Sequence, residues 1–153
     1  MAAISFLCLL ISLLTVISAP TADALTAYEV LQSYDFPVGL LPKGVTGYEL
    51  NSGTGKFTLH LNQTCTFKIQ GYDLRYQKTI TGTISKDRIS IQSGIQVKIL
   101  FWFNIVRVTR IDDQLEFSVG LLSADFPVDS FYESPQCGCG FDCVNLFRGF
   151  SSD

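Results

Sequence analysis

His60 is the only histidine of the chain, and its imidazole is the side chain best suited to act as a general base near neutral pH. A Ser-His-Asp hydrolase would have to use it, because a hydroxyl nucleophile needs such a base. No Gly-x-Ser-x-Gly elbow is present to expose a serine. His60 also alternates with Lys56 and Thr58 on the polar face of an expected strand. This pattern favours a solvated strand histidine over a catalytic one.

Four cysteines, Cys65, Cys137, Cys139 and Cys143, could bind a soft metal or form disulfides. The spacing of the last three matches no common zinc signature, so we expect two disulfides and no metal. Three connectivities are open. A bridge between Cys137 and Cys139 is the least plausible, because one intervening residue strains the geometry. We favour Cys65–Cys137, with Cys139–Cys143 closing a small local loop.

Two short motifs fall at expected turns. The run Gly53-Thr54-Gly55-Lys56 is reminiscent of a phosphate-binding loop, but Phe57 stands where Ser or Thr must bind magnesium, and a strand follows. A hairpin turn suits it better, and no cofactor is expected. The run Asn62-Gln63-Thr64 is a permitted N-glycosylation sequon between two strands. Asn62 is therefore a glycosylation candidate if the chain is secreted, and otherwise part of an unused turn.

The amino-terminal residues indicate the cellular compartment of the protein. Met1 to Ala19 carry no charged side chain, and Ala22-Asp23-Ala24 is a small-x-small triplet. The apolar stretch from Ile4 to Ile17 is too short for the roughly 20 residues that a spanning helix needs. We predict a signal peptide over residues 1–24 and a secreted protein, although the segment has no Lys or Arg. Retention in the secretory pathway and an uncleaved anchor are the alternatives. Cleavage would remove Cys8 and leave an even number of cysteines.

Composition narrows the class of protein. The 153 residues carry a formal net charge of -3 and no Lys/Arg-rich block, which argues against nucleic acid as a partner. About 130 residues would remain after cleavage, the size of one domain. We expect that domain to span residues 25–143, followed by a disordered tail over 144–153. The oligomeric state stays open.

The hydropathy pattern changes from helical to strand-like along the chain. Apolar residues at three- to four-residue spacing predict a short helix from Leu25 to Tyr34, ended by Phe36-Pro37. The segment Val38 to Gly44 is apolar but full of helix and strand breakers, which indicates a packed loop. Beyond Tyr48 the period becomes two. The expected strands are Lys56–Leu61, Cys65–Ile69, Asp73–Ile84, Arg88–Ile91, Ile95–Ile99 and, last, Leu115–Val119, with turns at residues 85–87, 93–94 and 112–114.

Many short strands at this spacing predict an all-β fold, an antiparallel sandwich or flattened barrel of about 8–10 strands with one short N-terminal helix. The alternation slips once, because Val106 and Val108 fall on the opposite face from the preceding alternate residues Ile95, Val97, Ile99, Phe101, Phe103 and Ile105. A β-bulge near Phe103–Ile105 would restore the register. Across Leu100–Phe103 both faces are apolar, so this stretch is either a covered central strand or an exposed apolar patch.

A six-residue pattern occurs twice. Ser33-x-Asp35-Phe36-Pro37-Val38 recurs as Ser123-x-Asp125-Phe126-Pro127-Val128. Six positions are too few for a repeat domain. Each copy is expected to be a polar turn whose Phe enters the core.

The order and spacing of several motifs resemble a plant protein family, the domain of unknown function 538. These motifs are Gly39-Leu40-Leu41-Pro42 and Gly44-Val45, the Cys65 strand, Ile80–Ile84, Gly94–Lys98, the Trp102 region, Phe117-x-Val119-Gly120 and Phe131–Cys137. The resemblance implies a secreted, apoplastic β-sandwich or barrel-like domain without an established activity. Lipid or lipopolysaccharide binding and a carboxylesterase-like activity have been proposed for the family, with links to stress responses and trichome growth. Cys139 and Cys143 lie beyond the usual family ending, so the resemblance implies nothing about their pairing.

The leading functional interpretation is a non-catalytic domain that binds a lipid or another amphipathic ligand. The apolar loop Val38–Leu41 and the apolar run Leu100–Phe103 could line a pocket or form a surface patch. Side chains of these two stretches are therefore ligand-binding candidates. Ordinary core packing is the simpler explanation of both stretches, because buried strands have the same composition. Peripheral membrane contact is compatible with the same residues. The alternatives are a hydrolase with His60 as base and an extracellular protein-interaction module. The ligand-binding candidates are Leu40, Leu41, Leu100, Trp102 and Phe103.

Overall fold

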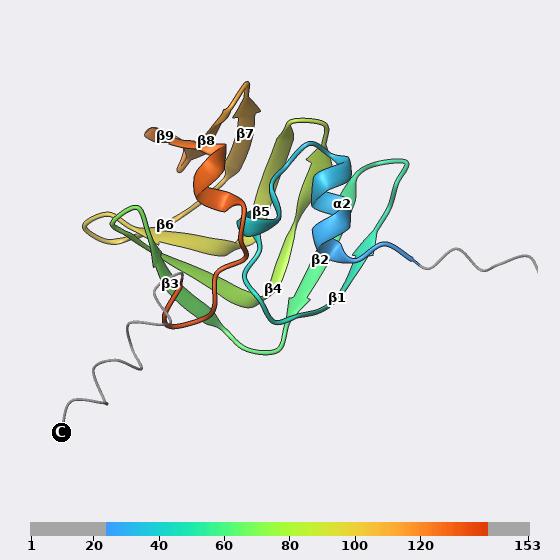
Figure 1. Ribbon diagram of the computed structural model, residues 1–153, viewed down its shortest axis with the longest axis horizontal. Helices are drawn as coiled ribbons and strands as arrows, with labels where there is room; N and C mark the ends of the chain where they lie inside the picture. The colour runs from blue at the N-terminus through green and yellow to red at the C-terminus, as the bar shows by residue number, and fades with distance from the viewer. Residues whose placement is uncertain (1–23, 141–153) are drawn as a thin grey trace, which may run out of the picture.

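Alternation of apolar and polar side chains produces strands over most of the chain. The computed structural model describes residues 24–140, and within them nine strands form one antiparallel sheet (Figure 1). The elements in chain order are helix α2 (Ala27–Ser33), 3-10 helix η1 (Val38–Leu40), strands β1 (Val45–Leu50), β2 (Lys56–Leu61), β3 (Cys65–Ile69), β4 (Tyr72–Ser85), β5 (Arg88–Lys98), β6 (Trp102–Asn104), β7 (Arg107–Ile111), β8 (Gln114–Ser118) and β9 (Ser123–Pro127), and 3-10 helix η2 (Val128–Phe131).

The sheet is built around two long strands. Its order is β1-β2-β4-β5-β7-β8-β9, with β3 paired to β4 and β6 paired to β5 outside this path. Residues 72–76 of β4 pair with β3, and residues 79–83 pair with β2. β5 divides in the same way between β7 and β6. The predicted all-β antiparallel fold with one short helix is confirmed, and within the described residues the sheet is open rather than a closed barrel.

A bulge in strand β5 explains one wrong prediction. The turn expected at residues 93–94 does not form, and β5 continues through it as one strand. Gly94 has φ +108°, and a Cβ there would lie 2.6 Å from the carbonyl oxygen of Thr79. The pairing of β4 with β5 shifts register beside it, between Tyr76 and Thr81. Gly94 therefore marks a bulge inside a strand, where only glycine suits the backbone.

The predicted register slip near Phe103–Ile105 is present at Ile105–Val106, between β6 and β7. The Ile105 amide donates to the carbonyl oxygen of Ile95, whereas the Ile91 amide donates to that of Val106, so the extra residues, 92–94, lie in β5. A turn at residues 99–101 separates β5 from β6.

One further prediction about the strands is wrong, because β9 follows the strand that was expected to be the last. β9 contains Asp125 and Pro127, two residue types that are rare in strands, so the sequence pattern did not indicate a strand there. A strand at the edge of a sheet tolerates both.

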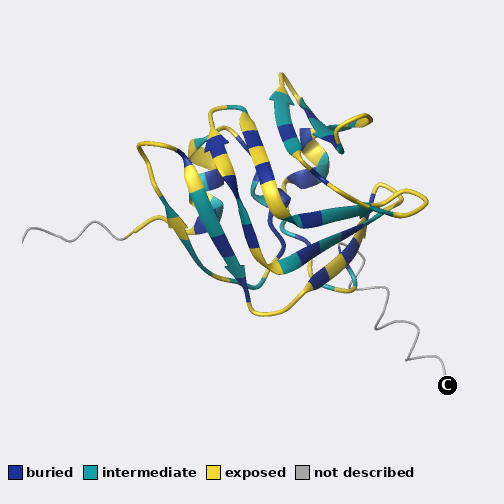
Figure 2. Ribbon diagram, turned by 180° about the vertical axis from the view of Figure 1, so that it is seen from behind, coloured by how far each residue is buried: buried dark blue, intermediate teal, exposed yellow. Residues whose placement is uncertain are grey.

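The helix begins at a strong local signal. Thr26 is its N-cap and forms a capping box with Glu29, in which each side chain accepts a hydrogen bond from the other residue's backbone amide. Ala27 and Leu31 are buried against the sheet. Figures 1 and 2, seen from opposite sides, place α2 and η2 on one face of the sheet. Figure 2 also shows buried and exposed residues alternating along the strands, as a sheet covered on one face requires.

The two copies of the six-residue pattern share a structure. Each leads through its proline into a 3-10 helix, Pro37 into η1 and Pro127 into η2. The two 3-10 helices pack together so closely that a Cβ on Gly39 would lie 2.3 Å from the carbonyl oxygen of Phe131. Phe36 enters the core as predicted, whereas Phe126 is only partly buried.

A disulfide ties the carboxy-terminal segment to the sheet. Cys65 of β3 is bonded to Cys137, 72 residues later in the chain, which confirms the predicted pair. Cys139 is also disulfide-bonded. Its predicted partner Cys143, the predicted tail over 144–153 and all but the last residue of the predicted signal peptide lie outside the described residues. No helix between residues 24 and 140 is long and apolar enough to cross a membrane.

Candidate ligand-binding cavities

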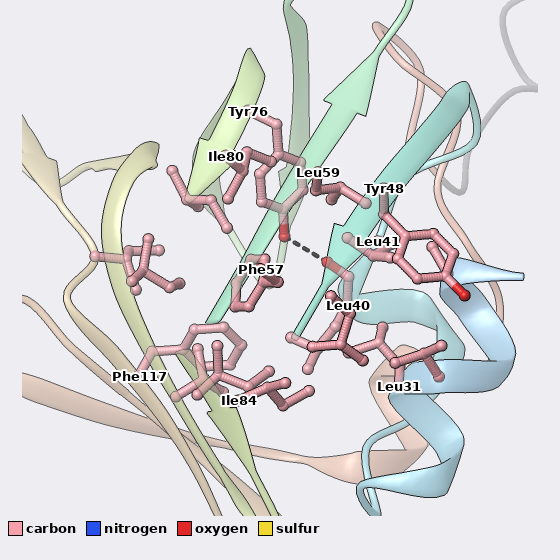
Figure 3. Close-up of a pocket in the computed structure, with 18 residues that line it drawn as sticks. Leu31, Leu40, Leu41, Tyr48, Phe57, Leu59, Tyr76, Ile80, Ile84 and Phe117 are labelled. Carbon is pink, nitrogen blue, oxygen red and sulfur yellow. Dashed lines mark hydrogen bonds between the residues drawn. The ribbon is translucent and has the colours of Figure 1, made fainter. Parts of the chain in front are cut away.

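The first cavity lies between helix α2, η1 and the covered face of the sheet, and has a volume of about 80 Å³ (Figure 3). Its walls come from side chains that alternate inward along six strands. All the lining residues are aliphatic or aromatic: Ala27, Val30, Leu31, Leu40, Leu41, Tyr48, Leu50, Phe57, Leu59, Tyr76, Ile80, Ile84, Ile89, Ile91, Ile95, Ile105, Val108 and Phe117.

Two tyrosine hydroxyls supply the polar side-chain atoms of this wall. The Tyr76 hydroxyl donates to the carbonyl oxygen of Leu40 at 2.7 Å, a bond drawn in Figure 3. The Tyr48 hydroxyl donates to the carbonyl oxygen of Leu25. Complete burial raises the pKa of the Tyr76 phenol, so this hydroxyl stays protonated and remains a donor. The wall of the first cavity therefore presents no charge to a ligand.

The second cavity lies at the end of the sheet that carries β3 and β6, and has a volume of about 230 Å³. Three hairpins contribute to it, namely β3–β4, β5–β6 and β8–β9. The lining residues are Ile69, Tyr72, Leu74, Val97, Ile99, Ile105, Phe117, Val119, Leu122, Ser123, Ala124, Phe126 and Phe131. No charged side chain is among them. The cavity can therefore take an apolar group, and its described lining offers no ionic anchor inside.

Ile105 and Phe117 line both cavities, so the two spaces adjoin. Phe117 is held by aromatic contacts, with its ring centroid 5.5 Å from that of Phe126 and 5.5 Å from that of Phe131. Ile105 is buried, and its backbone amide donates to the carbonyl oxygen of Ile95. A change of rotamer at Phe117 or Ile105 would therefore alter the wall that the two cavities share.

The structure separates the five ligand-binding candidates into two groups. Leu40 and Leu41 are buried and line the first cavity. Leu100, Trp102 and Phe103 line neither cavity, and Leu100 and Phe103 are exposed on the β5–β6 hairpin. Trp102 is partly covered by Arg75, whose guanidinium carbon lies 4.1 Å from the ring centroid. Of the two readings of this stretch, the exposed apolar patch therefore fits the structure.

Several cavity residues were not identified from the sequence. Phe117 and Val119 were visible as one face of an expected strand, but nothing local marked that face as a cavity wall. Phe126 was expected to enter the core rather than to line an open space. Their common environment depends on β9, which the sequence pattern did not predict.

His60 lies apart from both cavities. Its neighbour Leu59 lines the first cavity, so His60 points to the opposite face of β2. Its Nε2 lies 2.9 Å from the Glu49 carboxylate of β1, in an exposed hydrogen bond. The esterase alternative would thus need a nucleophile and a substrate site on the outer face of the sheet.

Asn62 lies in the turn between β2 and β3 and is exposed. Its backbone amide donates to the carbonyl oxygen of Gly44, which fixes the turn. The amide group of its side chain is at the surface, where a glycan could be accommodated. Whether it is modified stays a prediction.

An open antiparallel sheet covered on one face by a short helix, with two adjoining apolar cavities beneath, defines an all-β domain with a hollow apolar interior. The model of the family described as "Protein of unknown function, DUF538" matches residues 27–132. The chain belongs to this family. It is also 27% identical over 94 residues to an uncharacterized protein of Arabidopsis thaliana, over 61% of this chain and 55% of that protein. The chain thus spans about half the length of this relative.

Proposed function

We propose that this protein is a secreted, non-catalytic binding protein for a lipid or another amphipathic molecule, whose apolar part occupies the second cavity. The observation that carries the proposal is that cavity of about 230 Å³, lined by apolar side chains and left unfilled by residues 24–140. Its rim includes the exposed residues Tyr72, Ile99 and Leu122. An open rim provides a path for a ligand to enter.

The size of the cavities limits the ligand. Small-molecule pockets are typically about 300–1,000 Å³, so the second cavity alone, at about 230 Å³, falls below this range. It suits a short acyl chain or the end of a longer one. Movement of Ile105 or Phe117 would add the first cavity, of about 80 Å³, for a longer chain. Each methylene taken from water contributes about 0.8 kcal/mol, so affinity is expected to rise with chain length until the space is filled.

The uncharged lining also limits how the ligand is oriented. A buried ionised headgroup without a partner would lose its hydration, at a cost of several kcal/mol. The polar head is therefore expected to stay at the rim, in water, while the apolar chain lies inside. Selection would act on the length and shape of the chain more than on the headgroup.

Binding is tested with protein secreted from eukaryotic cells and purified without detergent. Native mass spectrometry is expected to show bound lipid, and a fluorescent fatty acid is expected to bind. Ala124→Phe should fill the second cavity and weaken probe binding by about tenfold or more. Val106→Phe adds the same ring at an exposed position outside both cavities and should leave binding unchanged. Absence of bound lipid together with equal probe binding by all three proteins would contradict the proposal.

Secretion is tested separately by sequencing the amino terminus of the protein recovered from the medium. We expect it to begin at Leu25, after the small-x-small triplet. A protein that keeps Met1 and remains with the membrane fraction would favour the uncleaved anchor.

A further inference from the structure

We propose that the turns around the mouth of the second cavity form a docking surface for a phospholipid bilayer that contains anionic lipids. The surface, here called the apolar rim, consists of Tyr72, residues 99–101 and residues 119–122. Docking itself does not depend on the proposed function. Its consequence, that ligand passes directly between bilayer and cavity, rests on that function.

The apolar rim exposes large side chains that a water-soluble surface would normally bury or replace. Leu121 is fully exposed, while Leu100, Phe101 and Leu122 are 81%, 73% and 61% exposed. No charged residue occurs from Ile99 to Val106 or from Phe117 to Ala124. Contiguous exposed apolar groups of this kind mark contact sites for membranes or other molecules.

The turns belong to one surface because they surround one opening. The β5–β6 turn contributes Ile99 to the wall of the second cavity. The β8–β9 turn contributes Val119 and Leu122, and the β3–β4 hairpin contributes Ile69 and Tyr72. In Figure 1 the β5–β6 loop projects from the left side of the molecule beside β3, and in Figure 2 its residues are exposed. A membrane that covers the rim would also cover the mouth of the cavity.

The charges behind the rim favour an anionic surface. Lys98 directly precedes Ile99, and Arg75 stacks on Trp102; within the described residues neither makes an ion pair. Lys68 and Asp73 offset each other at 3.7 Å. Asp125 is the acidic residue nearest to Leu122 in the chain. Unpaired basic groups next to the apolar turns, in a chain of net charge -3, match the charge of anionic headgroups.

The shape of the rim favours a bilayer over a protein partner. Separate turns that project around an opening can each enter a deformable headgroup layer. A protein partner would instead need a surface of complementary shape. Aromatic side chains such as Trp102 and Phe103, set just behind the tips, suit the membrane–water interface.

The experiment compares three secreted proteins in sedimentation with vesicles: the wild type, the double variant Leu100→Ser/Phe101→Ser, and Ile111→Ser. Neither Leu100 nor Phe101 lines a cavity, so ligand binding in solution should persist in the double variant. Ile111 is an equally apolar, exposed residue of the β7–β8 hairpin, whose turn lies at the opposite end of β8 from residues 119–122 of the rim. All three proteins share one amino terminus, so differences between them report the substituted positions.

With vesicles of phosphatidylcholine and phosphatidylglycerol, the wild type and Ile111→Ser should sediment alike. The double variant should bind about tenfold or more weakly, because two large apolar side chains are lost from the contact. Emission of Trp102, the single tryptophan, should shift to the blue on binding. Lys98→Glu should weaken binding to these vesicles but not to phosphatidylcholine alone.

Equal sedimentation of the wild type and the double variant would overturn the proposal. Self-association through the rim without vesicle binding would also overturn it and assign the surface to a second copy of the chain. If the protein carries bound lipid in native mass spectra but does not sediment with vesicles, the proposed function stands and only the docking proposal is rejected. Vesicle binding without ligand binding would reject the proposed function alone.

Discussion

Tyr76 and Leu40 are joined inside the first cavity by a hydrogen bond of 2.7 Å, from the tyrosine hydroxyl to the leucine carbonyl oxygen. The bond connects β4 to the 3-10 helix η1, 36 residues apart in the chain. It satisfies a backbone acceptor in surroundings where water is scarce and the lining is apolar. One polar contact thus holds the buried loop Val38–Leu41 against the sheet.

Removal of that donor should be costly. Tyr76→Phe keeps the ring but leaves the Leu40 carbonyl without a partner, and should lower the free energy of unfolding by about 1–3 kcal/mol in urea titrations. Tyr72→Phe is the matched control, because the Tyr72 hydroxyl makes no hydrogen bond within the described residues and should change stability little. Equal effects of the two substitutions would mean that the hydrogen bond contributes nothing specific.

The acidic pair at the end of helix α2 should give the protein a specific pH dependence. Asp87 lies beside Asp35, and one of its carboxylate oxygens, Oδ1, is buried without a hydrogen-bond partner in the described part of the chain. The hydrogen bond that a protonated Asp87 can donate to Asp35, then desolvation and the negative charge of Asp35, raise the pKa of Asp87. The folded state therefore holds this proton more tightly than the unfolded chain does.

The sign of the effect follows from linkage. The stabilising contribution of Asp87 is complete below its unfolded pKa of about 3.9 and is lost as the pH rises through the raised folded value. Asp87→Asn imitates the protonated form and tolerates the φ of +63°. Between about pH 3.5 and about pH 7, the melting temperature of Asp87→Asn should rise relative to that of the wild type as the pH increases. Asp35→Asn should flatten the same difference, and parallel curves for all three proteins would reject this origin.

The close packing of η1 against η2 can be tested at one glycine. Gly39→Ala would place a methyl group 2.3 Å from the Phe131 carbonyl oxygen, so one of the two 3-10 helices must move. We expect a loss of about 1–3 kcal/mol in the free energy of unfolding. Gly47 in β1 has no atom within 4 Å of the corresponding position, so Gly47→Ala should be close to neutral. An unchanged free energy of unfolding in Gly39→Ala would show that η1 and η2 can move apart at little cost.

The Cys65–Cys137 disulfide should contribute strongly to stability. It closes a segment of 72 residues, which corresponds to about 4 kcal/mol in the chain-entropy model and to less where the unfolded chain keeps structure. The double variant Cys65→Ala/Cys137→Ala should therefore unfold at lower denaturant concentration, by about 2–4 kcal/mol. It should also become sensitive to proteases after Phe131, where the segment is no longer tied to β3. Unchanged stability would imply that packing alone holds this segment.

Prediction from sequence succeeded where one local signal determined the structure. Strict alternation placed β2 and β3 at their observed bounds, and the proline after Phe36 limited the helix. It failed where tertiary context decided. Gly94 has the sequence signature of a turn but serves as a bulge, because neighbouring strands hold β5 extended on both sides.

The candidate site shows the same limit. Leu40 and Leu100 are both leucines in apolar runs, yet one is buried in a cavity wall and the other is exposed at a turn. Hydropathy cannot separate these outcomes, because a buried strand and an exposed apolar tip have the same composition. The second cavity depends on three hairpins that are far apart in the chain, so no window of sequence contains it.

The long strands β4 and β5 belong to both ends of the sheet at once, and this sharing bears on how the protein can unfold and diversify. Neither end of the sheet is hydrogen-bonded independently of β4 and β5. Unfolding of one end should therefore unfold the other in a single cooperative transition. The region that matches the family, residues 27–132, contains both long strands whole. Relatives are therefore expected to vary in their hairpin turns, where length and composition can change while the shared strands stay intact.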